Sequence, residues 1–192
     1  KTPQVKRVIV STEDGEIAKV ARAAGAKVVD RPADLASDTA SSESVLRHVL
    51  DHLARDEAYV PELVAFLQCT SPLRTSDALE NAIDLIIRES ADSLVSVSPS
   101  HRFLWQIDSQ GRPMPVNYDY RNRPRRQDMR PQFAENGSIY IFKPWILLEL
   151  NNRLGGTISM HVMDELAALD IDTEADCAVA EAILRTGGRR RG

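Results

Sequence analysis

The sequence lacks most of the features that mark secreted, membrane-bound or nucleic-acid-binding proteins. Its only two cysteines, Cys69 and Cys177, form neither a disulfide framework nor a metal-binding spacing, which suits a reducing compartment. No apolar run approaches the roughly 18 residues that a membrane span requires. The formal net charge of -4 predicts neither a nucleic acid nor a membrane as a partner. The first residues do not have the pattern of a signal peptide, so we expect a cytoplasmic protein.

Short apolar strands and amphipathic helices alternate along most of the chain. Residues 7–11 and 26–30 are β-branched apolar runs, and the segment between them has apolar residues at helical spacing. The continuous apolar run at 63–68 is typical of a parallel strand covered on both faces. Further strands are expected at 93–100, 138–142 and 157–163. This alternation predicts an α/β fold, a Rossmann-like three-layer sandwich with a mainly parallel sheet.

Residues 101–135 interrupt the alternation because they are polar, rich in Arg and Pro, and without regular periodicity. A structureless loop of that length is improbable inside a compact domain. We therefore expect a hairpin or small subdomain that projects from the sheet and makes a subunit contact. The chain then divides into the first part of an α/β domain at 1–100, this excursion at 101–135, the rest of the domain at 136–186, and a flexible Arg-rich tail at 187–192.

Polar side chains gather where the expected strands end, which is where open α/β sheets bind ligands. They combine hydroxyl groups and arginines with one pair of carboxylates, and such a set suits an anionic, phosphorylated ligand with a divalent metal. The set comprises Ser11, Thr12, Asp14, Arg31, the loop from there to Ser42, Gln68, Thr70, Ser71, Arg74, His101, Asp170 and Asp172.

The carboxylate pair, Asp170 and Asp172, lies between an apolar segment and the last expected helix. Alternate residues of an extended segment point to the same side, so both carboxylates could bind one cation. The alternative is that Asp172 or Thr173 caps the helix, since Thr173 and Asp176 resemble a loose capping box. A cap explains Asp172 but leaves Asp170 unexplained.

The other candidates also have purely structural interpretations. Arg31 precedes a proline and could simply end a strand. Ser41 or Ser42 could cap the next helix. The basic segment at 121–127 is either a solvated face or a site for carboxylate or phosphate recognition.

Two features of the segment after residue 66 are more specific. The amide of Gln68, at the end of an apolar strand, must find hydrogen-bond partners. Residues 70–72 look like the start of a helix, with Arg74 in its first turn.

Four motifs, RPADLASDTASS, LQCTSPLRT, RRQDMRPQFAENGSIYIF and ALDIDTEAD, occur in this order. Together they resemble the N-acylneuraminate cytidylyltransferases, or CMP-sialic acid synthetases, and relatives that act on other nine-carbon 2-keto acids. The resemblance extends from about Arg7 to Leu184. It implies a nucleotide-binding α/β domain with a dimerisation excursion, and a homodimer. The implied reaction joins CTP and a sialic-type acid into a CMP-sugar with release of pyrophosphate, with Mg²⁺, or Mn²⁺, as cofactor.

The resemblance also implies a role for each matching residue. Asp170 and Asp172 match the acidic pair associated with Mg²⁺, which neutralises charge during transfer at phosphorus. The remaining matches are Arg31, Ser42 and the adjoining Ser41 for the nucleotide, Gln68, Asn136 and Tyr140 for the sugar, and Arg126 for the sugar carboxylate.

Two departures from the family pattern leave alternatives open. Family members begin with a strand and a loop of the form P-A-R-x-G-S-K that binds the triphosphate, and nothing after Lys1 matches it. We therefore expect the chain as written neither to turn over nor to be fully stable. Trp105 stands where some relatives have a basic residue, which leaves the sugar acid undefined. The alternatives are an enzyme like CMP-Kdo synthetase and a non-catalytic member that binds sugar or dimerises; an animal source would imply the nucleus.

Overall fold

The computed structural model describes residues 2–37, 39–75 and 77–187. The helices are α1 (Gly15–Ala23), α2 (Ser42–Glu57), α3 (Ala78–Arg88), α4 (Pro144–Leu150) and α5 (Glu174–Gly187), with 3-10 turns η1 (Ala33–Ala36), η2 (Tyr120–Asn122), η3 (Arg126–Asp128) and η4 (Glu165–Ala168). The strands are β1 (Ile9–Thr12), β2 (Lys27–Asp30), β3 (Val64–Phe66), β4 (Ser93–Pro99), β5 (Trp105–Ile107), β6 (Pro113–Pro115), β7 (Phe133–Phe142) and β8 (Ile158–Val162). The predicted tail lies outside the described residues from residue 188 onward.

Three sheets make up the described strands. The largest has the order β3-β7-β4-β8, while β1 pairs with β2 in parallel and β5 pairs with β6 as a hairpin. In the four-stranded sheet, β4 and β8 are parallel, and β7 runs antiparallel to both β3 and β4. Three of the four strands therefore share one direction. The predicted α/β fold is confirmed, in a sheet that is mixed because of β7.

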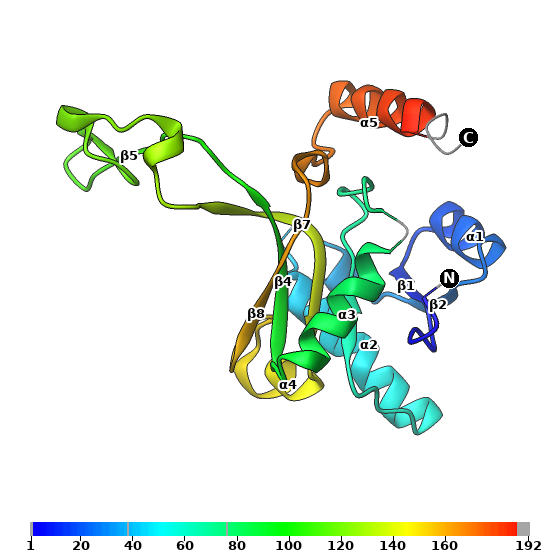
Figure 1. The fold of residues 1–192 in the computed structure, drawn as a ribbon. Helices are drawn as coiled ribbons and strands as arrows, with labels where there is room; N and C mark the ends of the chain where they lie inside the picture. The colour runs from blue at the N-terminus through cyan, green and yellow to red at the C-terminus, as the bar shows by residue number, and fades with distance from the viewer. Residues whose placement is uncertain (1, 38, 76, 188–192) are drawn as a thin grey trace.

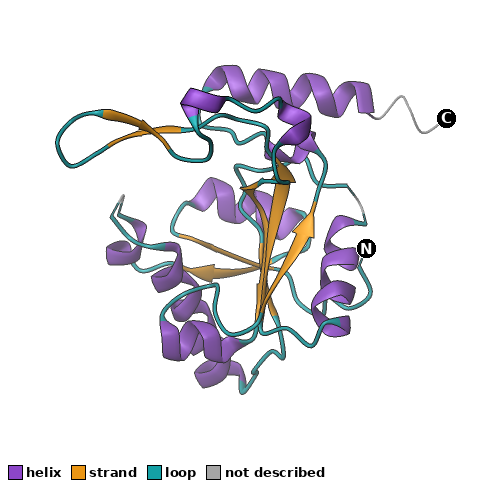
Figure 2. Ribbon diagram, turned by 60° about the vertical axis from the view of Figure 1, so that its left-hand side comes forward, coloured by secondary structure: helices purple, strands orange, loops and turns teal. Residues whose placement is uncertain are grey.

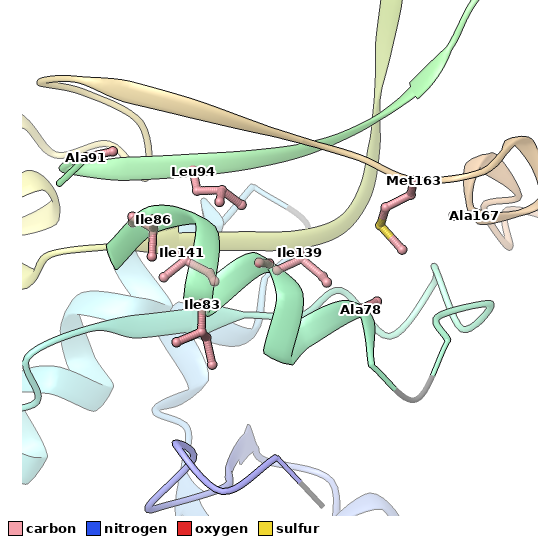
Figure 3. Packing of buried hydrophobic residues seen from close by; sticks show 10 residues of the cluster. Ala78, Ile83, Ile86, Ala91, Leu94, Ile139, Ile141, Met163 and Ala167 are labelled. Carbon is pink, nitrogen blue, oxygen red and sulfur yellow. The ribbon is translucent and has the colours of Figure 1, made fainter. Parts of the chain in front are cut away.

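Helices cover both faces of the four-stranded sheet, as Figure 2 shows. On one face, α3 packs Ile83 and Ile86 against Leu94, Ile139 and Ile141, and these side chains form the largest buried cluster (Figure 3). On the other face, α2 and α4 bury a smaller apolar cluster against β7. Truncating a fully buried Leu or Ile to Ala costs about 2–5 kcal/mol, so these clusters supply much of the stability. The arrangement is a three-layer sandwich.

The apolar run at 63–68 behaves only partly as predicted. Leu63 and Leu67 pack toward the α3 cluster while Val64 and Phe66 pack toward the α2–α4 cluster, so the run is apolar because both of its faces meet helices. The expectation of a parallel pairing was wrong, since β3 has three residues and is hydrogen-bonded to β7 in the antiparallel sense.

Helix starts agree with the capping patterns at two of three sites. Ser41 caps α2 by accepting a hydrogen bond from the Ser44 N–H, so the cap is Ser41 and not Ser42. The predicted helix start at residues 70–72 is wrong, because α3 begins at Ala78. The turn before α3 is instead stabilised by Arg74, whose guanidinium donates hydrogen bonds to the carbonyl oxygens of Gln68 and Ser71.

The third helix start is that of α5, where Thr173 and Asp176 form a capping box. The Thr173 Oγ1 accepts from the Asp176 N–H at 3.3 Å, and the Asp176 carboxylate accepts from the Thr173 N–H at 2.9 Å. The Thr173 hydroxyl also donates to the Asp176 carboxylate at 2.7 Å, and this hydrogen bond, with the one from the Thr173 N–H, lowers the pKa of Asp176. The Asp172 N–H also donates to Asp176, but within the described residues the Asp172 carboxylate accepts no hydrogen bond from the first turn of α5.

The segment between β4 and β7 projects from the sheet and carries the β5–β6 hairpin (Figure 1). It is held together by its own aromatic contacts: Trp105 Nε1 donates to the Tyr118 hydroxyl at 2.9 Å, and the Phe103 ring meets that of Tyr118 edge-on at 4.6 Å. The guanidinium of Arg123 lies 4.2 Å from the Phe103 ring centre. None of the helices in the described residues is long and apolar enough to cross a bilayer.

A charged cluster joins the β1–β2 unit to the C-terminal end of α2. The Glu57 carboxylate pairs with Arg7 at 2.7 Å and also with Lys27 of β2. Arg7 lies 3.7 Å from the centre of the Tyr59 ring. The hydrogen bond from Lys27, with that from Arg7, lowers the pKa of Glu57, whereas burial opposes the shift. The unit that carries Arg31 is therefore attached to α2 through Glu57.

Glu57→Gln is expected to lower the melting temperature near neutral pH. A carboxylate whose folded pKa is depressed stabilises the fold above its ordinary pKa of 4.5, and this contribution is lost as the pH falls through the folded value. The variant should therefore lose less stability than the wild type between pH 6 and pH 3, as followed by thermal unfolding across that range. Asp56→Asn is the matched control, because the Asp56 ion pairs, with His52 and Arg55, lie within α2. Equal melting curves for Glu57→Gln and wild type would contradict the role of this cluster.

Candidate functional site

The turn from residue 68 to residue 74 is organised by one half-buried guanidinium. Arg74 Nη1 donates to the carbonyl oxygens of Ser71 at 2.6 Å, Ser138 at 3.0 Å and Gln68 at 3.2 Å. Burial lowers the pKa of Arg74. The group stays charged at neutral pH, because guanidinium groups in proteins remain protonated. Arg74 therefore fixes the turn between β3 and α3 onto β7.

The same turn holds the segment that carries the acidic pair. Ser71, which is 1% exposed, donates from its hydroxyl to the Asn136 carbonyl at 3.1 Å and lies 3.5 Å from Asp170 Oδ1. The Ile171 N–H donates to the Thr70 carbonyl at 2.8 Å. The structure thus brings the loop after β3, the start of β7 and the segment after β8 together at one edge of the sheet. This is the edge where β3, β4 and β8 have their carboxyl ends.

Asn136 lies in a buried irregularity of β7. Its Oδ1 accepts from the Ser96 hydroxyl at 2.6 Å and from the Ser138 N–H at 3.1 Å, and its Nδ2 donates to the Ser98 hydroxyl at 3.1 Å. The Ser96 hydroxyl also accepts from the Ile139 N–H at 2.7 Å, which satisfies a backbone group that the sheet ladder leaves out. The Asn136 side chain therefore fixes the backbone around it. The sequence patterns above did not single out Ser96 and Ser98, although alternate serines in an apolar strand were the available signal.

Gly137 allows Gln68 to approach this irregularity. Its φ is +66°, and a Cβ there would lie 2.6 Å from Gln68 Oε1 and 2.9 Å from Ser71 Oγ. A residue with a side chain would be strained and would also displace both neighbours. Gln68 follows β3 in the loop, and its amide lies beside Gly137 at the edge of the sheet.

Asp170 and Asp172 are both exposed, on an irregular segment between η4 and α5. Because Thr173 and Asp176 make the cap of α5, neither carboxylate is explained as a helix cap. In the described parts of the chain, no group of three or more His, Cys, Asp or Glu side chains is arranged to hold a metal ion. Two exposed carboxylates nonetheless fit Mg²⁺, which is commonly held by one or two carboxylates together with substrate phosphates and water.

Tyr140 lies on the opposite face of β7 from Ile139 and is 6% exposed. Its hydroxyl donates to Glu135 Oε2 at 2.8 Å, and its ring stacks on Phe66 with a centroid distance of 6.2 Å. Burial, with the hydrogen bond to Glu135, raises the pKa of Tyr140 to about 12. The phenol is therefore neutral across the physiological range. Arg153 covers the ring and pairs with Glu43, which follows Ser42 in the first turn of α2.

Among the described residues, Arg31 and Arg126 make no side-chain hydrogen bond or ion pair with Gln68, Ser71, Asn136 or Asp170. Arg31 follows β2, where its guanidinium donates to the Ser11 carbonyl and lies 3.8 Å from Glu13. Arg126 is exposed in η3, on the projecting segment.

A solved structure shares this arrangement of elements. A CMP:2-keto-3-deoxy-manno-octonic acid synthetase complexed with CTP superposes with a TM-score of 0.69, covering 97% of this chain and 84% of that chain, at 14% sequence identity. At that identity the likeness establishes the fold alone, an α/β sandwich that the two proteins share.

Sequence comparisons define the family. A family model described as cytidylyltransferase matches residues 1–107. The N-acylneuraminate cytidylyltransferase A of Danio rerio is 36% identical over 184 residues, which are 94% of this chain and 41% of that protein. The CMP-N,N'-diacetyllegionaminic acid synthase of Campylobacter jejuni is 32% identical over 185 residues, 93% of this chain and 77% of that protein. The chain belongs to the cytidylyltransferase family, and the resemblance to N-acylneuraminate cytidylyltransferases is confirmed.

Gly137→Ala is expected to reduce the free energy of unfolding by more than the roughly 1–2 kcal/mol that a left-handed conformation costs a residue with a Cβ. The excess arises because Gln68 and Ser71 must move. Gly25→Ala is the control, since Gly25 also has a positive φ of +86° but no atom within 4 Å of the place that a Cβ would take. Denaturant unfolding of both variants makes the comparison, and equal losses would show that Gly137 is required only for its backbone conformation.

Proposed function

We propose that the protein transfers a cytidylyl group from CTP to a nine-carbon 2-keto sugar acid, of the sialic or legionaminic type, and releases pyrophosphate. The observation that carries this proposal is the Ser71 junction, through which the loop bearing Gln68 contacts both Asn136 and Asp170. The sugar-binding and acidic candidates thereby share one edge of the sheet. The chain spans 41% of the length of the Danio rerio relative, so the activity of the whole protein is part of the proposal.

In the proposed reaction, the anomeric hydroxyl of the sugar acid attacks the α-phosphorus of CTP. A new P–O bond forms, the bond to the pyrophosphate oxygen breaks, and the hydroxyl proton passes to solvent or a nearby base. Asp170 and Asp172 would hold Mg²⁺ or Mn²⁺, which supplies positive charge to the phosphate oxygens. Catalysis of this kind depends on positioning and on charge neutralisation. The exposed carboxylates are open to such a ligand, whereas the buried Ser71 hydroxyl orients Asp170.

The remaining candidates divide between the two substrates. Gln68 has a side-chain amide that can donate to and accept from sugar hydroxyls. Tyr140, whose phenol is neutral at physiological pH, can contribute its ring and hydroxyl without adding charge. Arg31 and Ser42 are proposed to bind the nucleotide, because arginine suits phosphate and Ser42 opens α2.

Arg126 is proposed to bind the sugar carboxylate across a homodimer. The projecting segment that carries it exposes several large apolar side chains, which a second copy could cover. These are Leu104 (46% exposed), Trp105 (51%), Ile107 (68%), Met114 (40%) and Val116 (52%). We infer a cytoplasmic protein, or a nuclear one in an animal. The basic segment would then complete the candidate site of the second copy.

The experiment that tests the function is pyrophosphate release from CTP by the full-length protein, with N-acetylneuraminate, N,N'-diacetyllegionaminate and Kdo offered separately. Release with a nine-carbon acid supports the proposal. Kdo as the sole substrate would favour a CMP-Kdo synthetase instead. Sugar-acid binding without CTP binding or turnover would favour a non-catalytic member.

Asp170→Asn is expected to reduce turnover by orders of magnitude and to leave the melting temperature nearly unchanged. Asp170 is exposed and its contact with Ser71 is long, so its charge contributes little to folding, whereas an amide is a poor ligand for Mg²⁺. Initial rates across a Mg²⁺ titration, with thermal unfolding of the same samples, measure both effects.

Asp176→Asn serves as the control, because Asp176 belongs to the α5 cap. It should lower the melting temperature and retain turnover. Full activity of Asp170→Asn at limiting Mg²⁺ would remove Asp170 from the metal site.

A further inference from the structure

Arg153 occupies an unusual position between two of the candidate binding groups. Its guanidinium carbon lies 4.8 Å from the centre of the Tyr140 ring and 5.5 Å from that of Phe66. Its Nε lies 2.9 Å from Glu43 Oε1, so the two groups form an ion pair. One planar cation therefore contacts two aromatic faces and a carboxylate, which is the geometry that guanidinium groups favour.

Both members of the ion pair are largely removed from solvent. The side chain of Arg153 is 23% exposed and that of Glu43 is 16% exposed. Ion pairs in such surroundings are less screened than those at the surface, and removal of one partner leaves the other charge poorly solvated. Glu43 is in the first turn of α2 directly after Ser42, so the pair attaches this helix end to the sheet face that carries Tyr140.

We propose that Arg153 is a positioning residue that couples the CTP site to the sugar-acid site. Through its ion pair with Glu43, Arg153 fixes the position of the N-terminal turn of α2, where Ser42 is proposed to bind the nucleotide. Through the stacking of its planar guanidinium on the ring, Arg153 also fixes the orientation of Tyr140, which is proposed to bind the sugar. This inference rests on the proposed function and extends it, because it makes the two sites depend on one side chain that is among neither set of binding candidates.

The test is steady-state kinetics of Arg153→Ala, Arg153→Lys and Glu43→Gln in the full-length protein, with CTP and the best nine-carbon acid varied in turn. Arg153→Ala should raise KM for both substrates at least several-fold. Glu43→Gln should raise KM for CTP and leave KM for the sugar acid within about twofold, because Arg153 still covers Tyr140. Arg153→Lys keeps the charge but loses the planar group, so it should rescue KM for CTP better than KM for the sugar acid.

Arg47→Ala is the matched control. Arg47 also extends from α2, but it donates to the carbonyl oxygens of Leu147 and Leu148 at 2.8 and 2.9 Å, at the end of α4. The Arg47→Ala variant loses the hydrogen bonds between α2 and α4 but keeps the contacts of Arg153 with Tyr140 and Glu43. It should lower the melting temperature and leave both KM values unchanged. A merely structural role for Arg153 would give the same result as Arg47.

The outcomes separate this inference from the proposed function. An inactive wild-type protein overturns the function, whereas an active wild type with unchanged KM values in Arg153→Ala overturns the coupling. Hydrogen exchange gives a readout independent of turnover. The amides of residues 44–46 should exchange faster in Arg153→Ala and Glu43→Gln than in Arg47→Ala, and equal exchange in all three variants would also overturn the proposal.

Discussion

The candidate site depends on the guanidinium of Arg74. A half-buried cation is costly, and this one is compensated by three carbonyl oxygens. These come from the turn after β3 and from β7, so a single side chain determines how the turn lies on the sheet. Ser71 then transmits that geometry to Asn136 and Asp170. Gln68, the candidate sugar contact, and Asp170, the candidate metal ligand, are thereby located relative to each other by the half-buried Arg74, the buried Ser71 and the backbone hydrogen bond from Ile171 to Thr70.

The reversed direction of β7 explains why the site lies where it does. In a purely parallel sheet only strand ends meet at this edge, but here the beginning of β7 joins the ends of β3, β4 and β8. The projecting segment leaves from β4 and returns into β7 at this same edge. Its base therefore adjoins the candidate site while its tip extends away from the sheet (Figure 1). The irregularity around Gly137 provides room for the Gln68 side chain at that junction.

Sequence periodicity was sufficient for the elements whose burial follows one simple pattern. The buried strand β4, in which serines alternate with apolar residues, and the spaced apolar residues of α2 and α3 could be predicted because their faces meet other elements directly. The pairing direction of β3 could not be read in the same way, since Val64 and Phe66 are equally apolar whichever way the neighbouring strand runs. The start of α3 was misplaced for a different reason. The carbonyls at residues 68 and 71 are bound by Arg74, a tertiary contact that overrides the local resemblance to a helix start.

Some candidate site residues could likewise be identified from the sequence, whereas the contacts that they make could not. Motifs identified the acidic pair and Asn136, but only coordinates reveal that Thr173, and not Asp172, caps α5, and that the Asn136 amide is engaged with Ser96 and Ser98. No local pattern could have indicated Arg153, because its partners lie on β3, β7 and α2, all distant in sequence. Contacts of this kind are set by topology, which a single sequence expresses only weakly.

The Ser71 junction has a consequence for how the molecule acquires its shape. Its two contacts span 65 and 99 residues of sequence, to Asn136 and Asp170 respectively. Closing such long loops costs chain entropy before any contact forms, and proteins rich in non-local contacts fold slowly. A growing chain that has reached only the projecting segment has helices and β4 but no β7 to join them. The edge of the sheet that gathers the candidate ligands can therefore form only after the segment that follows β8 has been synthesised.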